Sequence, residues 1–418
     1  MRLADPAGRG EKIAENCSRK PPARLFFQDM SPLPLTPLPA IGGRLALFAL
    51  LLLLSFLPPS SLAADTPGIP LIDVTDLYHP YQDPGDNFDL VAAYGFPEID
   101  LRAVILDATQ SIRAGKIDPG FIPVIQLNYI FDRNVPYGVS PFRKMQSPAD
   151  KLLDVPAFQQ SGIQLILDTL RRSKQKVHIV SFGSARTIAA AYNREPALFS
   201  KKVARIHLSA GGAPKGALEW NVLLDPNAIV CLLRSHLPID IYPCSSPVNI
   251  PNPKVDTCGS YVLGKHNTYW LLPDLGFIAS MDPHLRRYLA YSFTRASRSD
   301  FLGAIDDPAT DAAIPTFTSR RHHVWETSVW QGITGRKLVS RDNAGYRLLP
   351  DANPGDKVIT ESLRPCSVQV EDNGSYRWDF NHPSKNFRIY ERQDPQADQK
   401  ALREALPALY QSFKPKTR

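Results

Sequence analysis

The chain has 418 residues, with 48 Lys and Arg against 41 Asp and Glu, and 43% of it is hydrophobic. This length and composition indicate a globular protein with a large core and exclude a disordered or fibrous chain. The basic residues are scattered, without a long basic face or basic residues interleaved with aromatic ones. Nucleic acid is therefore not an expected partner.

The first segment with a clear pattern is an apolar stretch near the N-terminus. Arg44 precedes thirteen residues, 45–57, in which only Ser55 is polar, and small residues follow up to Ala64. A basic flank, a short apolar run and small residues are typical of a secretory signal peptide. A membrane anchor or a buried helix is the alternative, but a bilayer span takes about 20 residues. We therefore expect a signal peptide over residues 30–64.

The expected signal peptide determines the domain organisation. Met30 would start a signal of ordinary length, so residues 1–29 are expected to be an upstream extension or a misassigned start. Removing residues 1–64 takes away seven basic and four acidic side chains, which leaves 41 against 37. The mature protein, residues 65–418, would be one domain, exported to the periplasm or the exterior, without a stable membrane anchor.

Carboxylates crowd the junction between the first expected strand and helix. The apolar strand 71–76 ends in acidic residues, a Pro-Gly turn follows, and further Asp residues open the helix before Leu90. Five Asp fall within the seventeen residues 73–89. They could be separate caps and turn residues, because Asp is favoured at both. A cluster of this size repels itself unless it holds a cation, so we expect a metal site.

A second strand over 103–106 completes a strand, helix, strand unit of a parallel sheet. The Asp-rich strand end, the Asp-Pro-Gly turn, the Asp-led helix and the Pro-Glu-Ile-Asp-Leu segment 97–101 together resemble the N-terminal motif of the inosine-uridine-preferring nucleoside hydrolases. The resemblance implies a calcium-dependent hydrolysis of an N-glycosidic bond. The chain departs from the family where seven extra residues separate Asp76 from Asp83, and where Gln110, a candidate substrate contact, stands in place of the usual Asn.

Helix and strand patterns then alternate in the manner of a doubly wound sheet. Helices are expected over 120–132, 157–172 and 185–192, and strands over 135–139, 177–182 and 203–209. Ligands in such sheets gather at the carboxyl ends of the strands. The fold class is thus α/β, with a mostly parallel, doubly wound sheet flanked by helices. By the resemblance, the backbone carbonyl of Phe182 would bind calcium.

The segment after the strand 203–209 supplies the expected sugar contacts. Glu219, Trp220 and Asn221 are similar to the Glu-Phe-Asn motif of the family, in which the Glu and Asn bind sugar hydroxyls. A carboxylate and an amide two residues apart point the same way from an extended loop, which suits a vicinal diol. The alternative is that the Asn caps the helix that begins at Asp225. Trp220 could stack on a base or a sugar, or simply line the core.

The family's late His-Asp-Pro motif is replaced by a different histidine segment. His322, His323 and Glu326 stand in its place. Glu326 could serve as a metal ligand and either histidine as the general acid, because a histidine pKa near neutrality suits that role. The alternative is a solvated helix start.

The C-terminal part contains an expected insertion and a final strand and helix. Residues 340–383, with Asn373-Gly374 as the strongest hairpin signal, are predicted to form a β-rich insertion over the mouth of the site or on its rim. Residues 386–390 and 397–413 resemble the family's last strand and helix. Cys244 and Cys258 bracket a Pro-, Ser- and Asn-rich loop and are the favoured disulfide, whereas Cys231 is expected to be a buried thiol.

These features predict an exported N-glycosidase. By the resemblance, metal-activated water attacks the anomeric carbon of a nucleoside or related riboside, with Asp76 or Asp83 as the base. Asp76, Asp83, Asp86, Asp89, the Phe182 carbonyl and Glu326 are the candidate Ca²⁺ ligands, and Asp86 or Asp89 could instead contact the diol. Two alternatives remain: hydrolysis of a non-nucleoside glycoside, and a non-catalytic calcium-stabilised sugar-binding protein. A homo-oligomer is left open.

Overall fold

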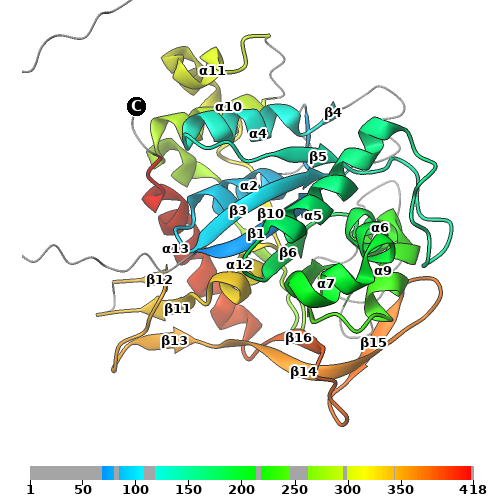
Figure 1. Ribbon diagram of the computed structural model, residues 1–418. Coiled ribbons are helices and arrows are strands. Elements are labelled where there is room, and N and C mark those ends of the chain that lie inside the picture. The colour runs from blue at the N-terminus through cyan, green and yellow to red at the C-terminus, as the bar shows by residue number, and fades with distance from the viewer. Residues whose placement is uncertain are drawn as a thin grey trace, which may run out of the picture. The chain divides into compact units, whose positions relative to one another are not determined.

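The structure is a computed structural model, and it describes residues 68–79, 84–107, 118–212, 218–244, 262–294, 299–342 and 344–415. These residues lie in one compact unit, Thr66–Arg418. At its centre the described chain forms a nine-stranded sheet with helices on both faces (Figure 1). No helix in the described ranges is both long and apolar enough to cross a membrane.

Seven strands of this sheet run parallel, in the order β16, β8, β7, β6, β1, β3, β5. This arrangement confirms the predicted α/β, mostly parallel, doubly wound sheet. The strands are β1 (Ile69–Thr75), β3 (Ile99–Leu106), β5 (Tyr137–Val139), β6 (Val177–Ser181), β7 (Val203–Ser209), β8 (Ile239–Tyr242) and β16 (Phe387–Arg392).

The two faces of the sheet carry separate cores because side chains alternate along each strand. On β1, Ile72 and Val74 pack into one core, and Leu71 packs into the other. The first core is covered by α5 (Ser161–Arg172), α6 (Arg186–Arg194), α7 (Pro196–Lys202) and α9 (Pro226–Leu233), and η1 (Ala157–Gln160) leads into α5. The second is covered by α2 (Pro84–Gly95), α4 (Phe121–Ile130), α10 (Pro283–Phe293), α12 (Thr327–Thr334) and α13 (Pro395–Ser412).

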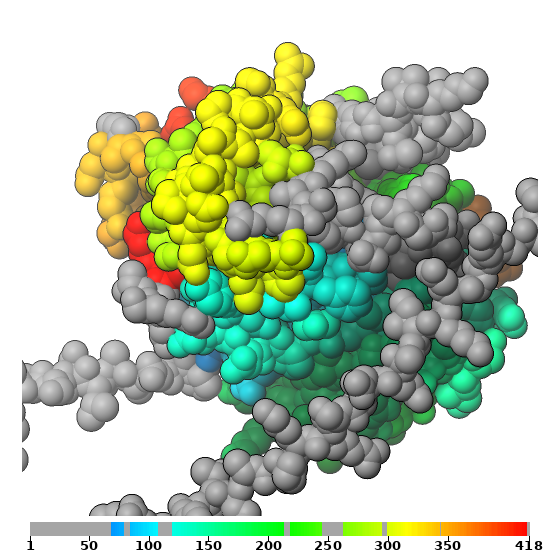
Figure 2. All heavy atoms as spheres, turned by 90° about the horizontal axis from the view of Figure 1, so that it is seen from above, coloured from blue at the N-terminus to red at the C-terminus, as the bar shows by residue number. Residues whose placement is uncertain are grey.

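Shorter elements connect these layers. They are β2 (Tyr78–His79), β4 (Asp118–Pro119), α8 (Trp220–Leu224), β9 (Trp270–Leu272), η2 (Gly276–Ser280), α11 (Gly303–Asp306), η3 (Pro308–Thr316) and β10 (His322–Val324). Figure 2 shows the yellow segment that includes α11 and η3 lying against the turquoise α4. The Gln126 side chain fixes this contact by donating to the Phe301 carbonyl at 2.9 Å.

The C-terminal insertion is β-rich, as predicted, with its pairing starting at Lys337. Its strands are β11 (Lys337–Ser340), β12 (Tyr346–Leu349), β13 (Lys357–Ile359), β14 (Glu361–Val370) and β15 (Tyr376–Asp379). The turn between β14 and β15 contains Gly374 at a φ of +87°, which explains the Asn-Gly signal.

Strand pairing places the insertion at one edge of the main sheet. Strands β11, β12 and β13 form their own sheet, while β14 pairs antiparallel with β16 and extends the edge of the main sheet. The β14–β15 hairpin reaches the carboxyl end of β7 through one side chain, Tyr376. Of the two expected places, the rim of the site fits this contact.

Cys231 is a buried free thiol in α9, as predicted, and its Sγ donates to Asn193 Oδ1 at 3.4 Å. The favoured partner of Cys244, Cys258, lies outside the described residues, so that disulfide stays a prediction.

Candidate active site

The carboxyl ends of β1, β6 and β7 meet at one edge of the sheet, where the sequence predicted a ligand site. Asp76 follows β1 and is 5% exposed, and Gly183 follows β6 against it. A Cβ on Gly183 would lie 2.8 Å from the Cβ of Asp76, so only glycine fits this position without a shift. The Trp220 indole of α8 donates to Asp76 Oδ2 at 3.4 Å. The structure thus brings Asp76 and Trp220 together.

Asn221 ties the same edge to two strand ends. Its Nδ2 donates to the Ser209 carbonyl at 2.8 Å and to the Phe182 carbonyl at 3.3 Å. These two carbonyls end β7 and follow β6, so the amide group bridges neighbouring strands. The Phe182 carbonyl, a predicted calcium ligand, therefore lies beside Asn221.

Glu219 sits directly before α8 and caps it. Its Oε2 accepts from the Gly211 amide at 3.0 Å and from the Asn221 amide at 3.2 Å. Burial raises the pKa of Glu219 to about 7, and the hydrogen bonds from backbone amides act in the opposite direction. The carboxylate is therefore held in place by the backbone of the loop that carries it.

The expected extended loop at Glu219 and Asn221 is wrong, because residues 220–224 form the short helix α8. The Asn does not cap the following helix either. Asp225 caps α9, accepting from the Ala228 amide at 3.3 Å. The two side chains still meet at one edge because Glu219 turns back onto the helix start while Asn221 reaches across to the strands.

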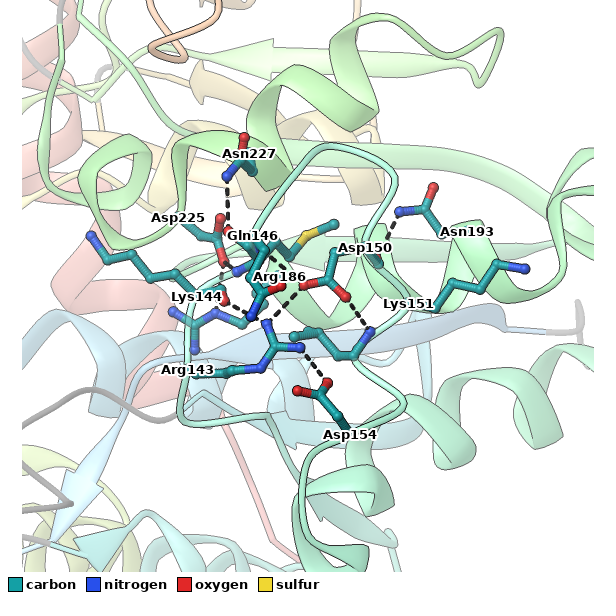
Figure 3. A network of polar contacts seen from close by, with 12 residues as sticks. Arg143, Lys144, Gln146, Asp150, Lys151, Asp154, Arg186, Asn193, Asp225 and Asn227 are labelled. Carbon is teal, nitrogen blue, oxygen red and sulfur yellow. Dashed lines mark hydrogen bonds and ion pairs between the residues drawn. The ribbon is translucent and has the colours of Figure 1, made fainter.

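Asp225 is held by a buried polar network rather than exposed for chemistry. Arg186, at the start of α6, donates through Nε to Asp225 Oδ2 at 2.9 Å, and the Met145 amide donates to the same oxygen at 2.8 Å. Arg143 pairs with Asp150 at 2.7 Å and also with Asp154, which folds the surrounding loop (Figure 3). This network fixes α8 and α9 relative to the sheet.

A second group of acidic residues is buried on the other face of β1. Asp73 and Asp89 are at most 1% exposed, and within the described part of the chain none of their carboxylate oxygens has a hydrogen-bond partner. Burial raises the pKa of Asp73 to about 8. Burial also raises the pKa of Asp89 well above its ordinary value, and the nearby charges of Asp73, Glu326 and Asp86 add to this shift. Asp86 itself is half-buried in the first turn of α2.

Two predicted ligands, Asp89 and Glu326, thus lie within electrostatic range of each other. Asp73 belongs to the five Asp of the predicted metal-binding cluster but is not among the individual ligands expected from the sequence. Asp83 and Gln110 lie outside the described residues. Among the residues that the structure describes, no three His, Cys, Asp or Glu side chains are grouped closely enough to hold a metal. The carboxylate oxygens of Asp73 and Asp89, which have no donor among the described residues, nevertheless have the ligand chemistry that Ca²⁺ prefers.

The two histidines lie on a strand, β10, rather than at a solvated helix start. Neighbouring strand residues face opposite ways. His322 is buried, with Nε2 3.7 Å from Glu326 Oε1 and its ring 5.3 Å from that of Phe88. His323 instead places its Nδ1 3.2 Å from the Tyr269 hydroxyl. The structure thus associates only His322 of the pair directly with Glu326.

Comparison with known proteins gives ribonucleoside hydrolases. No family model matches the sequence. The pyrimidine-specific ribonucleoside hydrolase RihA of Escherichia coli O1:K1 is 29% identical over 180 residues, and that of Salmonella schwarzengrund is 31% identical over 180 residues. Each match covers 38% of this chain and 56% of the relative, so the chain spans little more than half the length of the curated relatives it matches.

Solved structures of similar proteins include a purine-preferring ribonucleoside hydrolase from Gardnerella vaginalis and a plant nucleoside hydrolase, PpNRh1. The first has a TM-score of 0.43 and 15% identity, covering 82% of this chain and 99% of the other. The second has a TM-score of 0.46 and 15% identity, covering 84% and 100%. The matches in sequence confirm the resemblance that the motifs indicated.

Proposed function

We propose, from the premise that this chain is a divergent relative of the ribonucleoside hydrolases, that it hydrolyses the N-glycosidic bond of a ribonucleoside or related riboside. The observation that carries the proposal is the convergence of Asp76, Glu219 and Asn221 at the carboxyl ends of neighbouring parallel strands. That edge is where a doubly wound sheet binds its ligands.

Glu219 and Asn221 suit the recognition of a sugar diol. Asn221 directs its Nδ2 into two backbone carbonyls, which leaves its Oδ1 as the acceptor for a hydroxyl. Glu219 is a second acceptor, and a carboxylate can accept more bonds than the backbone amides supply. Two fixed acceptors thus match the two donors of a vicinal diol.

Asp76 is the base that the described residues offer for the attacking water, with Asp83 as the other candidate. In the reaction, water attacks the anomeric carbon, the carboxylate takes a proton from that water, and the bond to the base nitrogen breaks. Trp220 donates to Asp76 and is 37% exposed, so it holds the carboxylate while presenting part of its ring to a ligand. His322, paired with Glu326, is the candidate proton donor to the leaving group. His323, which contacts Tyr269, is the second candidate for this role.

Calcium belongs to the proposal as its finer part. The proposed ligands are Asp76, Asp83, Asp86, Asp89, Glu326 and the Phe182 carbonyl. Since no three of the described carboxylates are grouped closely enough to hold an ion, the site would need Asp83, which lies outside the described residues, and a rearrangement of the others around the ion. Within the described residues the oxygens of Asp73 and Asp89 have no hydrogen-bond partner, which supports a cation in this region, since buried carboxylates without donors are costly. A bound Ca²⁺ would orient the sugar and favour deprotonation of a water molecule.

Export is also proposed, with residues 30–64 as the cleaved signal, residues 65–418 as one mature domain and an insertion over about 340–383. The N-terminal sequence of the secreted protein tests this directly, because cleavage would begin it near Ala64 or Asp65. Small nucleosides or glycosides are the proposed partners, with a homo-oligomer left to be measured.

The function is tested by chromatography of uridine and inosine after incubation with the purified protein. Release of free base with ribose is expected from the wild type, and Asp76→Asn should lose it while still binding the nucleoside. Binding without release by the wild type would instead favour the sugar-binding role. Release of sugar from another glycoside, with none from nucleosides, would instead favour a non-nucleoside glycoside as the substrate.

A further inference from the structure

One peptide group links the C-terminal hairpin to the sugar-binding carboxylate. The carbonyl of Ala210 accepts a hydrogen bond from the Tyr376 hydroxyl at 2.7 Å. The amide of the same peptide unit, that of Gly211, donates to Glu219 Oε2 at 3.0 Å. The Tyr376 hydroxyl, the 210–211 peptide and the Glu219 carboxylate therefore form a continuous chain of hydrogen bonds.

The packing around this peptide leaves it little freedom. Tyr376 is 2% exposed, and Gly211 has a φ of +90°. A Cβ on Gly211 would lie 2.5 Å from the Tyr376 hydroxyl, so the ring rests directly on the glycine backbone. The Cys244 amide holds the next carbonyl by donating to Gly211 O at 2.8 Å. Tyr376 thus closes one side of the turn that faces Glu219.

We infer that Tyr376 is a positioning residue for Glu219, acting through the peptide between Ala210 and Gly211. The inference rests on the proposed function for the meaning of Glu219, but the hydrogen-bond chain itself does not require a substrate. The β14–β15 hairpin then has a role at the site. It supplies the Tyr376 hydroxyl, which sets the orientation and donor strength of the Gly211 amide.

The physical basis is polarisation along the chain. A hydrogen bond to a carbonyl oxygen polarises the peptide unit and strengthens its N–H as a donor, and this effect is larger in a buried setting. Burial raises the pKa of Glu219 to about 7, and the Gly211 amide acts to lower it. Burial raises the pKa of the Tyr376 hydroxyl, and the charges of Cys244, Glu219 and Cys366 raise it further.

Nuclear magnetic resonance can observe this peptide without any substrate. Labelling with ¹³C′-alanine and ¹⁵N-glycine selects the four Ala-Gly pairs of the chain, at Gly8, Gly115, Gly211 and Gly345. The Gly211 peak is identified as the one absent from Gly211→Ala. We expect Tyr376→Phe to move both the Ala210 carbonyl and the Gly211 amide resonances. Glu219→Gln should move the amide less when it is combined with Tyr376→Phe than when it is alone.

Kinetics supply the second readout. Tyr376→Phe removes only a hydroxyl, so we expect KM for the nucleoside to rise about threefold to tenfold, with kcat within about twofold of wild type. The matched control is Tyr94→Phe, at the C-terminal end of α2. It also removes a hydroxyl that donates a hydrogen bond, in this case to Asn128 Oδ1 at 3.0 Å. The control should leave both constants unchanged.

The inference is overturned if the Gly211 amide does not respond to Tyr376→Phe, or if the two substitutions act independently on it. It is also overturned if the wild type is active and Tyr376→Phe leaves KM unchanged. A wild type that releases no ribose would sink the proposed function alone, because the resonance of the peptide would still decide whether Tyr376 positions Glu219.

Discussion

Gly183 lies against Asp76 so closely that a Cβ at residue 183 would be 2.8 Å from the Asp76 Cβ. Gly183→Ala should therefore displace the proposed base. We expect kcat/KM to fall more than about tenfold, since small misplacement of a catalytic group is costly. The free energy of unfolding should fall by about 1–3 kcal/mol from overpacking.

The control for this substitution is Gly68→Ala, just before β1 and therefore at the other end of that strand from Asp76. A Cβ on Gly68 would lie 3.1 Å from the Asp100 Cβ. It should cost some stability with activity intact. Equal losses of activity in both variants would show that crowding, rather than the position of Asp76, is responsible.

Asn221→Asp tests the bridge between β6 and β7. The substitution replaces a donor by an acceptor that faces the carbonyls of Ser209 and Phe182. We expect a loss of about 1–3 kcal/mol in the free energy of unfolding by urea, because buried acceptors lose their partner. Asn381→Asp, at an exposed site, is the matched control. Unchanged stability of Asn221→Asp would contradict the bridge.

The paired histidines of β6 and β7 predict a pH dependence of stability. His178 Nδ1 and His207 Nε2 lie 2.9 Å apart, and burial lowers the pKa of both residues. The charge of Asp240 opposes this shift at His178, whereas the charges of Arg205 and Arg388 add to it at both rings. The unfolded chain therefore binds more protons than the native protein below about pH 6.5. Stability should be complete above that pH and decline as the pH falls through it.

Urea unfolding between pH 5 and 8 measures this dependence. His207→Gln removes one of the two titrating rings, so its stability should change less steeply over that range than the wild type's. The same slope in both proteins would mean that other groups govern the acid response.

Calcium should stabilise the protein after treatment with a chelator. Binding to the native state alone raises the free energy of unfolding by about 2.7 kcal/mol at a concentration 100 times the Kd. We expect a higher Tm with Ca²⁺ than in chelator, and a smaller increase in Asp89→Asn. Asp351→Asn, at an exposed position, should retain the full increase. An identical Tm with and without Ca²⁺ would remove the metal from the account.

Local sequence patterns predicted the frame of the fold well. The strand over 203–209 is β7 with the same bounds, and the expected helix over 397–413 is α13, Pro395–Ser412. Both carry an apolar periodicity that matches how they are buried. The ends of the strands then follow, and with them the edge where Asp76 and Asn221 meet.

Local sequence patterns did not predict the features that depend on residues far apart in the chain. β10 forms because it pairs with β9, some fifty residues earlier in the chain, so His322 and His323 did not look like a strand. β14 joins β16 at the edge of the sheet, a pairing that no local signal specifies. Tyr376 reaches Ala210 from 166 residues away. Contacts of this kind depend on tertiary structure, which overrides local propensity.

N-glycosidic hydrolysis is tested by measuring the release of reducing sugar from a panel of ribonucleosides by the purified mature protein, with calcium and with chelator. We expect release that depends on calcium, is lost in Asp76→Asn and is weakened in Glu219→Gln. No release from any ribonucleoside by a protein that calcium still stabilises would contradict the hydrolase assignment.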